Sequence, residues 1–501
     1  MKSNRAWKGT AATVIALGMV LTADGGGAMA AQGWNGQGAQ RANALDHAQG
    51  PQHDLQRSPK RSAASAAIVT VHAGKFIGTL PPLAYGMNTA VWDGNLFSDA
   101  VPGRLKELGV GLLRWPGGSY ADQYNWASDP AAFDQFMQLA HAVGATPMLT
   151  VNYGSGTPQD AADWVRYVDA HHQSALWEIG NEVYGDGEYD HASWETNNHT
   201  RKGPAGYGKN ALKYIDAMRK VDPRAQIGIV ATIPGFWPSG IAPYWDRTLL
   251  PIVGKQINFV IIHWYPQNPG QESDAGLLSS TSAIAGYMAT LKQYLKEYCG
   301  SNAPHVKIFL DETNSVSSNP GKQMMSAVNA LFLANDYNTW LENGVANVSW
   351  WDLHNSVTSG NVSSTLYGTA DYGDYGILSA GDSGEPPLNT PTASFWGYRM
   401  QNLFAHPGDR YLAVDSNQAM VNAYAVFKGR AEDSVMLVNT DPATTYSVSV
   451  RGVHIAPGTV VTEFSYGGRD PSIETSRPRF GAGVVTIPPY TMVVLDLPTK
   501  A

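Results

Sequence analysis

Cysteine and positive charge are both scarce in this chain of 501 residues. Cys299 is the only cysteine, so no disulfide can form within the chain and its stability must come from packing. Lys and Arg number 34 against 42 Asp and Glu, which gives a formal net charge of −8. Because nucleic acid and anionic membranes both require a basic surface, we expect neither as a partner.

Long apolar runs are missing except for one segment near the start. Basic residues precede an apolar stretch at 11–23, and small residues follow at 28–30. The stretch is shorter than the roughly 20 residues that a bilayer requires. This pattern predicts a secretory signal peptide at 1–30, and therefore a secreted or periplasmic protein that contacts no membrane after signal cleavage.

Regular hydrophobic patterning is absent from residues 31–63, which mix Gln, Gly, Ala and Pro. We interpret this segment as a flexible linker. The rest of the chain is different, because 43% of all residues are hydrophobic and 10% are aromatic, which excludes a disordered protein. A large folded core is therefore expected.

Between residues 83 and 404, short apolar runs alternate with longer helical patterns. The predicted strands are 83–88, 110–115, 146–152, 175–182, 226–232, 257–265, 306–313 and 346–352. Eight such units predict an α/β fold, a (β/α)₈ TIM barrel with enlarged loops. A doubly wound sheet is the competing fold, but no GxGxxG turn follows the first strand.

After residue 404 the pattern changes to short strands of alternating hydrophobicity, separated by turn residues. Residues 405–501 are therefore predicted to form an all-β sandwich, joined by N-terminal strands from 64–82. We expect this domain to support the barrel rather than to bind carbohydrate, because it has few of the aromatic residues that a sugar platform needs.

Two glutamates stand at the ends of predicted barrel strands. Glu182 ends the fourth strand and Glu312 ends the seventh, each after an apolar run. Active sites of such barrels lie at the carboxyl ends of the strands, and acidic residues are rarely buried without a task. Two carboxylates facing each other across a barrel mouth are the requirement of glycoside hydrolysis. We therefore predict Glu182 and Glu312 as catalytic residues.

Other polar and aromatic side chains at or just after strand ends are expected to bind the substrate. They are Arg114, Ser119, Asn152, Asn181, His263, Tyr265, Trp350 and Trp351. Because neighbours in a strand point in opposite directions, one of the two tryptophans should stack on a sugar and the other should pack outward. By the same alternation, Asp311 should point behind the barrel, away from Glu312.

Four motifs also carry a resemblance to a known clan. The segments LLRWPGGSYADQYNW, WEIGNE, HWY and DETN resemble retaining glycoside hydrolases with Asn-Glu on strand four and Glu on strand seven. Among these, the pattern most resembles glycoside hydrolase family 51, the α-L-arabinofuranosidases, with families 39, 44 and 79 as relatives. The resemblance implies that Glu182 is the acid/base and Glu312 the nucleophile. It also implies that Asn181 binds the sugar 2-hydroxyl, and that Arg114 and Tyr265 hold the nucleophile.

The implied geometry has electrostatic consequences. Arg114 beside Glu312 should keep that carboxylate ionised, and the charge of Glu312 at roughly 5 Å should hold the proton on Glu182. That separation also predicts retention of configuration.

The chain departs from the family 51 pattern at three places. Ser119 stands where that family has Asn, Thr313 where it has Trp, and Ala90 where it has an acid on strand one. The reaction class is expected to survive these changes, whereas the sugar that is bound can differ.

The sequence therefore predicts a secreted retaining glycoside hydrolase that cleaves oligo- or polysaccharides, in the manner of an exo-acting α-L-arabinofuranosidase. An endo-acting β-glycanase is one alternative, and a non-catalytic carbohydrate-binding or matrix protein, with 31–63 as a wall spacer, is another. The long loops at 183–208 and 353–389 should supply subsite residues. His191 and His199 in the first loop lack carboxylates at metal-ligand spacing, so we expect no metal or cofactor. The oligomeric state is left open.

Overall fold

The structure is a computed structural model that describes residues 64–187, 194–236, 242–429, 432–453, 455, 458–468, 470–480 and 483–498. The predicted signal peptide and linker, like His191, lie outside the described residues. Among the helices that are described, none has both the length and the apolar character needed to span a membrane.

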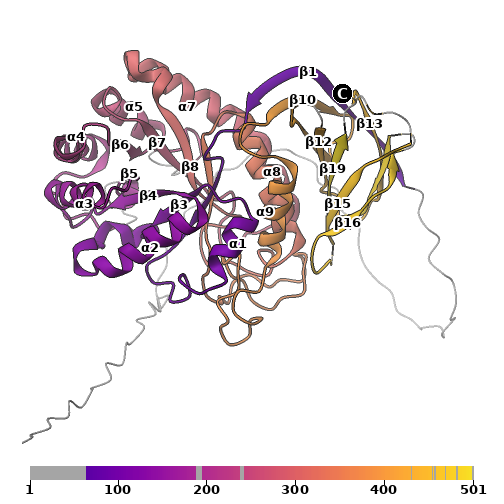
Figure 1. Ribbon diagram of the computed structural model, residues 1–501, viewed down its shortest axis with the longest axis horizontal. Coiled ribbons are helices and arrows are strands. Elements are labelled where there is room, and N and C mark those ends of the chain that lie inside the picture. Colours follow the sequence, from indigo (N-terminus) through magenta and orange to yellow (C-terminus); the bar gives the residue numbers. More distant parts are fainter. Residues whose placement is uncertain are drawn as a thin grey trace, which may run out of the picture. The chain divides into compact units, whose positions relative to one another are not determined.

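Eight parallel strands close into a barrel in chain order, which confirms the predicted TIM barrel (Figure 1). The strands are β2 (Tyr85–Asn88), β3 (Leu112–Trp115), β4 (Thr146–Val151), β5 (Leu176–Ile179), β6 (Gln226–Val230), β7 (Phe259–Trp264), β8 (Lys307–Thr313) and β9 (Asn347–Trp350). Several are shorter than predicted. β5 ends at Ile179 because Gly180 takes a positive φ of 76°, so Glu182 follows the strand instead of ending it.

Helices follow the strands and surround the barrel (Figure 1). They are α1 (Val101–Glu107), α2 (Pro130–Val143), α3 (Pro158–Ala170), α4 (Gly203–Val221), α5 (Ala242–Val253), α6 (Asp274–Ser280), α7 (Ile284–Tyr298), α8 (Ala327–Glu342) and α9 (Ala393–Phe404). Short 3₁₀ helices are η1 (Gly118–Gln123), η2 (Trp126–Ser128), η3 (Val183–Gly185), η4 (Thr281–Ala283) and η5 (Gly300–His305). Local sequence sets their ends: at the start of α3, Thr157 and Asp160 form a reciprocal capping box.

An irregularity in β8 changes which side chains enter the barrel. Ile262 of β7 lies opposite Leu310, but the next residue, His263, lies opposite Glu312, so Asp311 is an extra residue in β8. Such a bulge interrupts the alternation of side chains. Asp311 consequently points into the barrel interior beside Glu312, and the prediction that it points behind the barrel is wrong.

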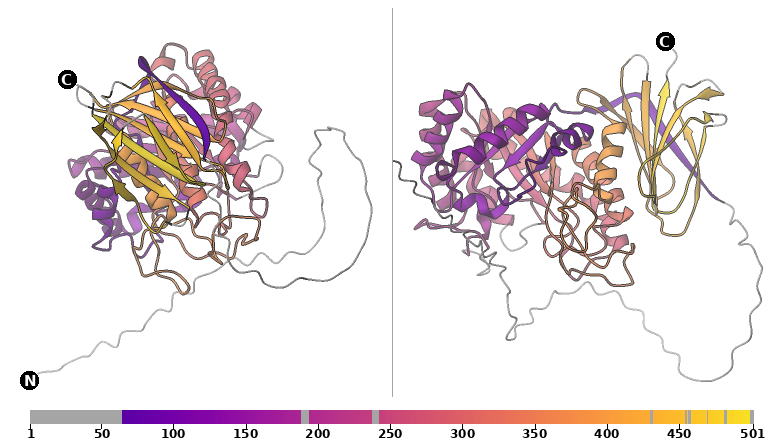
Figure 2. Two further views of the ribbon diagram at one scale, coloured as in Figure 1. Left: turned by 90° about the vertical axis from the view of Figure 1, so that its right-hand side faces the viewer. Right: turned by 60° about the horizontal axis from the view of Figure 1, so that its bottom comes forward.

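The C-terminal part forms a nine-stranded sheet in the order β16-β15-β19-β12-β11-β10-β1-β13-β18, and β14 and β17 pair in a separate two-stranded sheet. Figure 2 shows the indigo strand β1 among the orange and yellow strands of the large sheet. Its strands are β1 (Ser65–Thr79), β10 (Arg410–Ser416), β11 (Val421–Phe427), β12 (Glu432–Asn439), β13 (Tyr446–Arg451), β14 (Thr459–Val460), β15 (Thr462–Gly467), β16 (Glu474–Ser476), β17 (Arg479–Phe480), β18 (Val484–Ile487) and β19 (Thr491–Pro498). The predicted all-β domain is thus present. A single bulged strand, β1, forms in the segment 64–82, where more than one strand was predicted.

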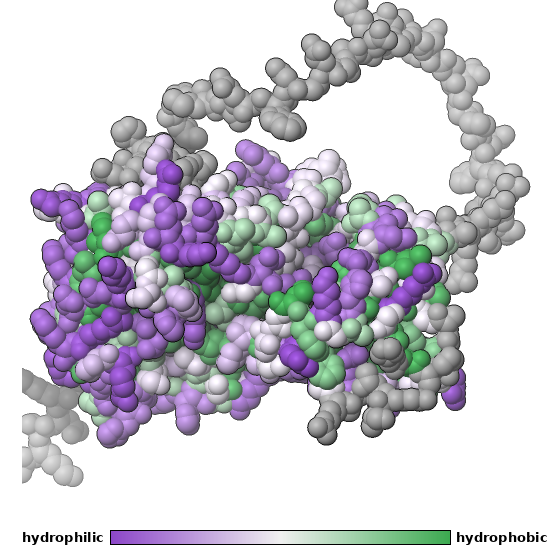
Figure 3. All heavy atoms as spheres, turned by 90° about the horizontal axis from the view of Figure 1, so that it is seen from above, coloured by the Kyte–Doolittle hydropathy of each residue, from purple (hydrophilic) through white to green (hydrophobic). Residues whose placement is uncertain are grey.

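Alternate side chains along a strand of this sheet pack into two different hydrophobic cores. Val435 and Leu437 of β12 pack inside the β domain, while Met436 and Val438 face the barrel. The helix α8 is buried on nearly all sides, as expected for a helix that lies between two layers. On the face drawn in Figure 3, hydrophilic side chains prevail and hydrophobic ones gather only in small areas.

Candidate active site

A cavity of about 560 Å³ opens at the carboxyl ends of the barrel strands. The side chains that line it and enter the argument below are Trp92, Ser119, Tyr120, Asn181, Glu182, Trp194, Tyr265, Glu312, Trp351 and Tyr375. The barrel therefore brings Glu182, after β5, and Glu312, at the end of β8, to one mouth.

Glu182 is held in an uncommon backbone conformation, with φ 35° and ψ 37°, immediately before η3. Its carboxylate accepts hydrogen bonds from the Trp194 indole at 2.7 Å and the Tyr184 hydroxyl at 3.2 Å. One oxygen each from Glu182 and Glu312 and one ring nitrogen of His263 lie within 4.8 Å of one another. Non-glycine residues with positive φ are costly and cluster at functional sites.

Glu312 is held from two sides. Its Oε1 accepts a hydrogen bond from Arg114 Nη1 at 2.5 Å, and its Oε2 accepts one from the Tyr265 hydroxyl at 2.9 Å. The Arg114 side chain is fully buried, whereas that of Glu312 is 7% exposed where it meets the cavity. Arg114 thus lies below the cavity and acts on the substrate only through its neighbours.

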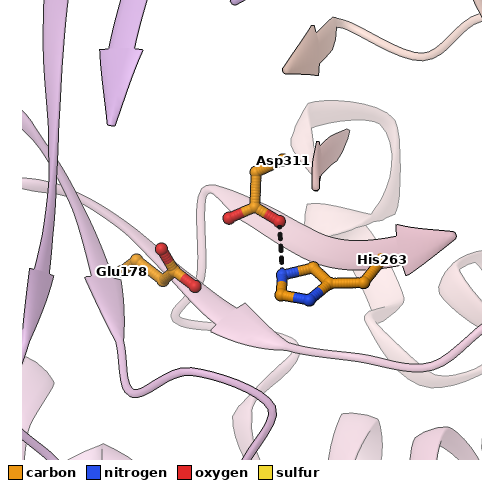
Figure 4. A group of neighbouring side chains, drawn as sticks. All are labelled: Glu178, His263 and Asp311. Carbon is orange, nitrogen blue, oxygen red and sulfur yellow. Dashed lines mark ion pairs between the residues drawn. The ribbon is translucent and has the colours of Figure 1, made fainter. Parts of the chain in front are cut away.

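Below the cavity lies a network of buried ionic groups. Arg114 donates to both oxygens of Glu178, at 2.8 and 3.0 Å, and its Nε lies 3.1 Å from Asp311 Oδ2. Burial raises the pKa of Glu178 to about 7, although the Arg114 charge opposes that rise. Figure 4 shows Glu178, His263 and Asp311 converging in the barrel interior. Glu178 and Asp311 were not among the predicted site residues, yet the acid inside the apolar run WEIGNE was a usable signal.

His263 bridges three carboxylates. Its Nε2 lies 2.9 Å from Asp311 Oδ1, and its Nδ1 lies 2.9 Å from Glu182 Oε1 and 3.4 Å from Glu312 Oε2. Burial disfavours the imidazolium, but the charges of Glu312 and Asp311 and hydrogen bonds to Asp311 and Glu182 raise the pKa of His263 well above its usual range. The surrounding carboxylates therefore favour the charged form of the ring, whose two nitrogens both face carboxylate oxygens.

This arrangement changes the expected place of the acid's proton. Burial raises the pKa of Glu182, but the His263 hydrogen bond and charge and the Trp194 and Tyr184 hydrogen bonds outweigh it and lower the pKa overall. The expectation that the charge of Glu312 holds the proton on Glu182 is wrong for this state, because a histidine cation lies between them. The lowered pKa of Glu182 and the raised pKa of His263 favour the proton on His263, one hydrogen bond away from Glu182.

The structure places two of the predicted substrate-binding residues away from the cavity. Asn152 Oδ1 accepts from the backbone N–H of Ser155 and Gly156, both at 2.9 Å, because it organises the turn after β4. Trp350 is fully buried and packs against Phe332 and Tyr337.

Of the remaining predicted residues, four line the cavity: Ser119, Asn181, Tyr265 and Trp351. Arg114 and His263 lie directly beneath it. At the departures from family 51, Thr313 donates to Asp336 of α8 at 3.0 Å and Ala90 is buried, and neither lines the cavity.

Aromatic side chains that the sequence did not single out form the rim. Trp92 is 50% exposed, and its ring centre lies 6.1 Å from that of Tyr120 and 6.3 Å from that of Trp351. Trp194 and Tyr375 belong to the loops 183–208 and 353–389, which the sequence predicted to supply subsite residues. Flat aromatic faces on an open cavity suit the apolar faces of sugar rings.

The His and carboxylate groups at the site meet the spacing of a metal centre, because two triads each lie within 4.8 Å. Both nitrogens of His263 already lie within 2.9 Å of carboxylate oxygens, and its raised pKa disfavours the neutral ring that a metal needs. Arg114 supplies a further cation among the same acids. These residues are therefore an ion-pair network rather than a metal site.

Comparison with known proteins supports the same fold. No family model matches the chain. An intracellular exo-α-L-arabinofuranosidase of Bacteroides ovatus is 24% identical over 260 residues, which cover 42% of this chain and 49% of that protein. An intracellular exo-α-(1→5)-L-arabinofuranosidase of Bifidobacterium longum is 23% identical over 265 residues, 44% of this chain and 45% of that one. The matches thus span about half the length of these relatives.

Solved structures cover more of the chain. The α-L-arabinofuranosidase of Thermotoga maritima superposes with a TM-score of 0.68 at 17% identity, over 86% of this chain and all of that one. A family 44 xyloglucanase of Paenibacillus polymyxa superposes with a TM-score of 0.62 at 12% identity, over 87% of this chain and all of that one. The chain thus has the barrel and β domain of glycoside hydrolases. Among these, family 51 arabinofuranosidases and family 44 glucanases are its structural neighbours, which confirms the resemblance at the level of the fold.

Proposed function

We propose that this chain is a retaining glycoside hydrolase in which Glu312 is the nucleophile and Glu182 the acid/base. The observation that carries the proposal is the pair of carboxylates at one cavity, with oxygens within 4.8 Å of each other. Retaining enzymes hold their two carboxyl groups about 5–5.5 Å apart, whereas inverting enzymes need roughly 6.5–9.5 Å to admit a water. The closeness of these oxygens supports the retaining mechanism.

In the first step, an oxygen of Glu312 bonds to the anomeric carbon while the bond to the leaving oxygen breaks. His263 Nδ1 passes its proton to Glu182 across 2.9 Å, and Glu182 gives a proton to the leaving oxygen, so the step ends with Glu182 as a carboxylate and His263 neutral. The new ester removes the charge of Glu312, which contributes most among the nearby charges to the raised pKa of His263. His263 therefore releases its proton as the nucleophile is consumed.

In the second step, Glu182 accepts a proton from water, the water oxygen bonds to the anomeric carbon, and Glu312 leaves as a carboxylate. Arg114 and Tyr265 donate to that carboxylate and stabilise it as the charge returns. Each residue named for these steps is held by at least one hydrogen bond from another barrel strand or loop.

For the substrate, we propose a terminal arabinofuranosyl or similar sugar at the end of an oligo- or polysaccharide. The named activity of the curated relatives supports this class. Of the three departures from family 51, only Ser119 lines the cavity, so it is the one that bears on the choice of sugar. The relatives above are named intracellular, whereas the signal pattern at 1–30 supports export of this protein.

The test is hydrolysis of a panel of 4-nitrophenyl glycosides and of arabinan and xyloglucan, with the first-formed anomer followed by proton NMR. Release of a single sugar with retained configuration is expected. Oligosaccharides as first products would favour endo action, and an inverted sugar would contradict the role of Glu312. No turnover of any substrate by the wild type, equal to that of Glu312→Ala, would instead favour a binding protein.

A further inference from the structure

We propose that Glu195 is a positioning residue that fixes Asn181 and Ser119 so that together they recognise one hydroxyl of the substrate. The family resemblance assigns Asn181 to the hydroxyl next to the reacting carbon, and the new inference is the role of Glu195 behind Asn181 and Ser119. This inference rests on the proposed function. Glu195 belongs to no motif noted in the sequence, and its side chain does not line the cavity. It acts from behind the two residues that do.

Glu195 reaches the site from the loop after β5. Its Oε1 accepts a hydrogen bond from the Ser119 hydroxyl at 2.6 Å and another from Asn181 Nδ2 at 3.0 Å. The backbone N–H groups of Trp194 and Glu195 both donate to the Gly185 carbonyl, at 3.0 Å. The Trp194 ring also packs so closely on Gly185 that a Cβ there would lie 2.3 Å from it. The loop is thus anchored next to the acid/base.

Two opposite partners determine which way the Asn181 amide faces. Its Oδ1 accepts from Arg114 Nη2 at 2.7 Å, and its Nδ2 donates to Glu195. The reverse orientation would set an N–H against the guanidinium and an oxygen against the acid. Asn181 lines the cavity, so the second N–H of its amide is the group that remains for the substrate.

Ser119 is oriented so that it offers a hydrogen-bond acceptor to the cavity, whereas Asn181 offers a donor. Its hydroxyl proton is used on Glu195, so the oxygen offers only lone pairs to the cavity that it lines. The two side chains therefore present one donor and one acceptor. A single hydroxyl that accepts from Asn181 and donates to Ser119 satisfies both, whereas a hydrogen or an ether at that position leaves at least one of them unpaired.

Glu195 can hold this geometry as a neutral acid. Its side chain is buried, and burial, together with the charges of Asp122 and Glu182, raises its pKa to about 10. Oε1 accepts both hydrogen bonds, so a proton on Oε2 leaves both of them in place. A glutamine keeps the acceptor oxygen without any charge, whereas a leucine of similar size removes the acceptor.

The experiment compares kcat and KM of the full chain and its Glu195→Gln and Glu195→Leu variants. The substrates are the 4-nitrophenyl glycoside that the wild type cleaves best and its 2-deoxy counterpart. Glu272→Leu is the matched control, because Glu272 is equally buried and accepts from an asparagine, Asn361, at 2.8 Å, but lies outside the cavity. It should match the wild type on both substrates.

We expect Glu195→Leu to lose about 10- to 100-fold in kcat/KM on the parent glycoside and less than about threefold on the 2-deoxy substrate, because only the former uses the oriented pair. Glu195→Gln should stay within about threefold on both. An equal loss on both substrates, full activity of the leucine variant, or a glutamine variant as poor as leucine would each overturn the proposal.

Crystal structures separate this outcome from failure of the proposed function. If the wild type cleaves no glycoside, the proposed function fails, but the side chains of Asn181 and Ser119 can still be compared. In Glu195→Leu they should turn away from their wild-type positions, and in Glu195→Gln they should keep them. Unchanged side chains in the leucine variant would refute the positioning role.

Discussion

Replacing Glu182 by alanine separates the two halves of the proposed reaction. Glu182 lies within 4.8 Å of the nucleophile, and its side chain is only 16% exposed, so bulk water cannot take over its task efficiently. A positioned general acid contributes about 10²- to 10⁴-fold in rate. We therefore expect about 10³-fold loss of kcat/KM for a disaccharide, whose leaving alcohol needs a proton.

The loss should depend on the leaving group. A 2,4-dinitrophenolate departs without a proton, so kcat/KM for the dinitrophenyl glycoside should fall by less than about tenfold. The second step still lacks its base, so the glycosyl-enzyme on Glu312 should accumulate and appear as a burst of dinitrophenolate. Azide, a small anion that needs no base, fits the space of the missing carboxylate and should release a glycosyl azide of retained configuration.

Rapid-quench kinetics with both substrates, with and without azide, measures these effects. The control is Glu272→Ala, which removes a buried glutamate outside the cavity and should leave both rates unchanged. An equal loss on both leaving groups would show that Glu182 is not the acid. An inverted glycosyl azide would show that azide attacks from the other face, and Glu312 would then not be the nucleophile.

Three further results are expected. Trp351→Ala should lower kcat/KM about tenfold and leave Tm unchanged, because its ring lines the cavity. Trp350→Ala should lower the free energy of unfolding, measured by calorimetry, by about 3–5 kcal/mol, because its ring is buried. Equal losses of Tm in the two variants would contradict these placements. Asn152→Ala should leave kcat/KM within about twofold, and a larger loss at unchanged Tm would place Asn152 in the site. Burial raises the pKa of Asp246 to about 7, so the folded chain retains a proton that the unfolded chain releases, and stability falls as pH rises from about 4 to 7. The Tm of Asp246→Asn should therefore exceed that of the wild type at pH 8 but not near pH 4. An equal difference in Tm at the two pH values would refute this linkage.

Much of the architecture follows from local sequence. Apolar runs of strand length between amphipathic helical patterns predict the barrel, since each run must be buried on both faces. Glu182 and Glu312 could be located because each follows such a run, and the carboxyl ends of parallel strands meet at one mouth. These features depend on residues that are close together in the chain, so the sequence alone is enough to predict them.

Features that depend on contacts between distant segments of the chain could be seen only in the tertiary structure. A bulge in β8 turned Asp311 inward, and the charge of His263 arises from carboxylates on β8 and after β5, so no local pattern could place the proton. Glu195 accepts a hydrogen bond from Ser119 only because the loops that follow β3 and β5 lie side by side. Alternation predicted opposite directions for Trp350 and Trp351, but only the packing of Phe332 and Tyr337 shows which one is buried. Electrostatics and packing act through space, and spacing along the chain does not measure those distances.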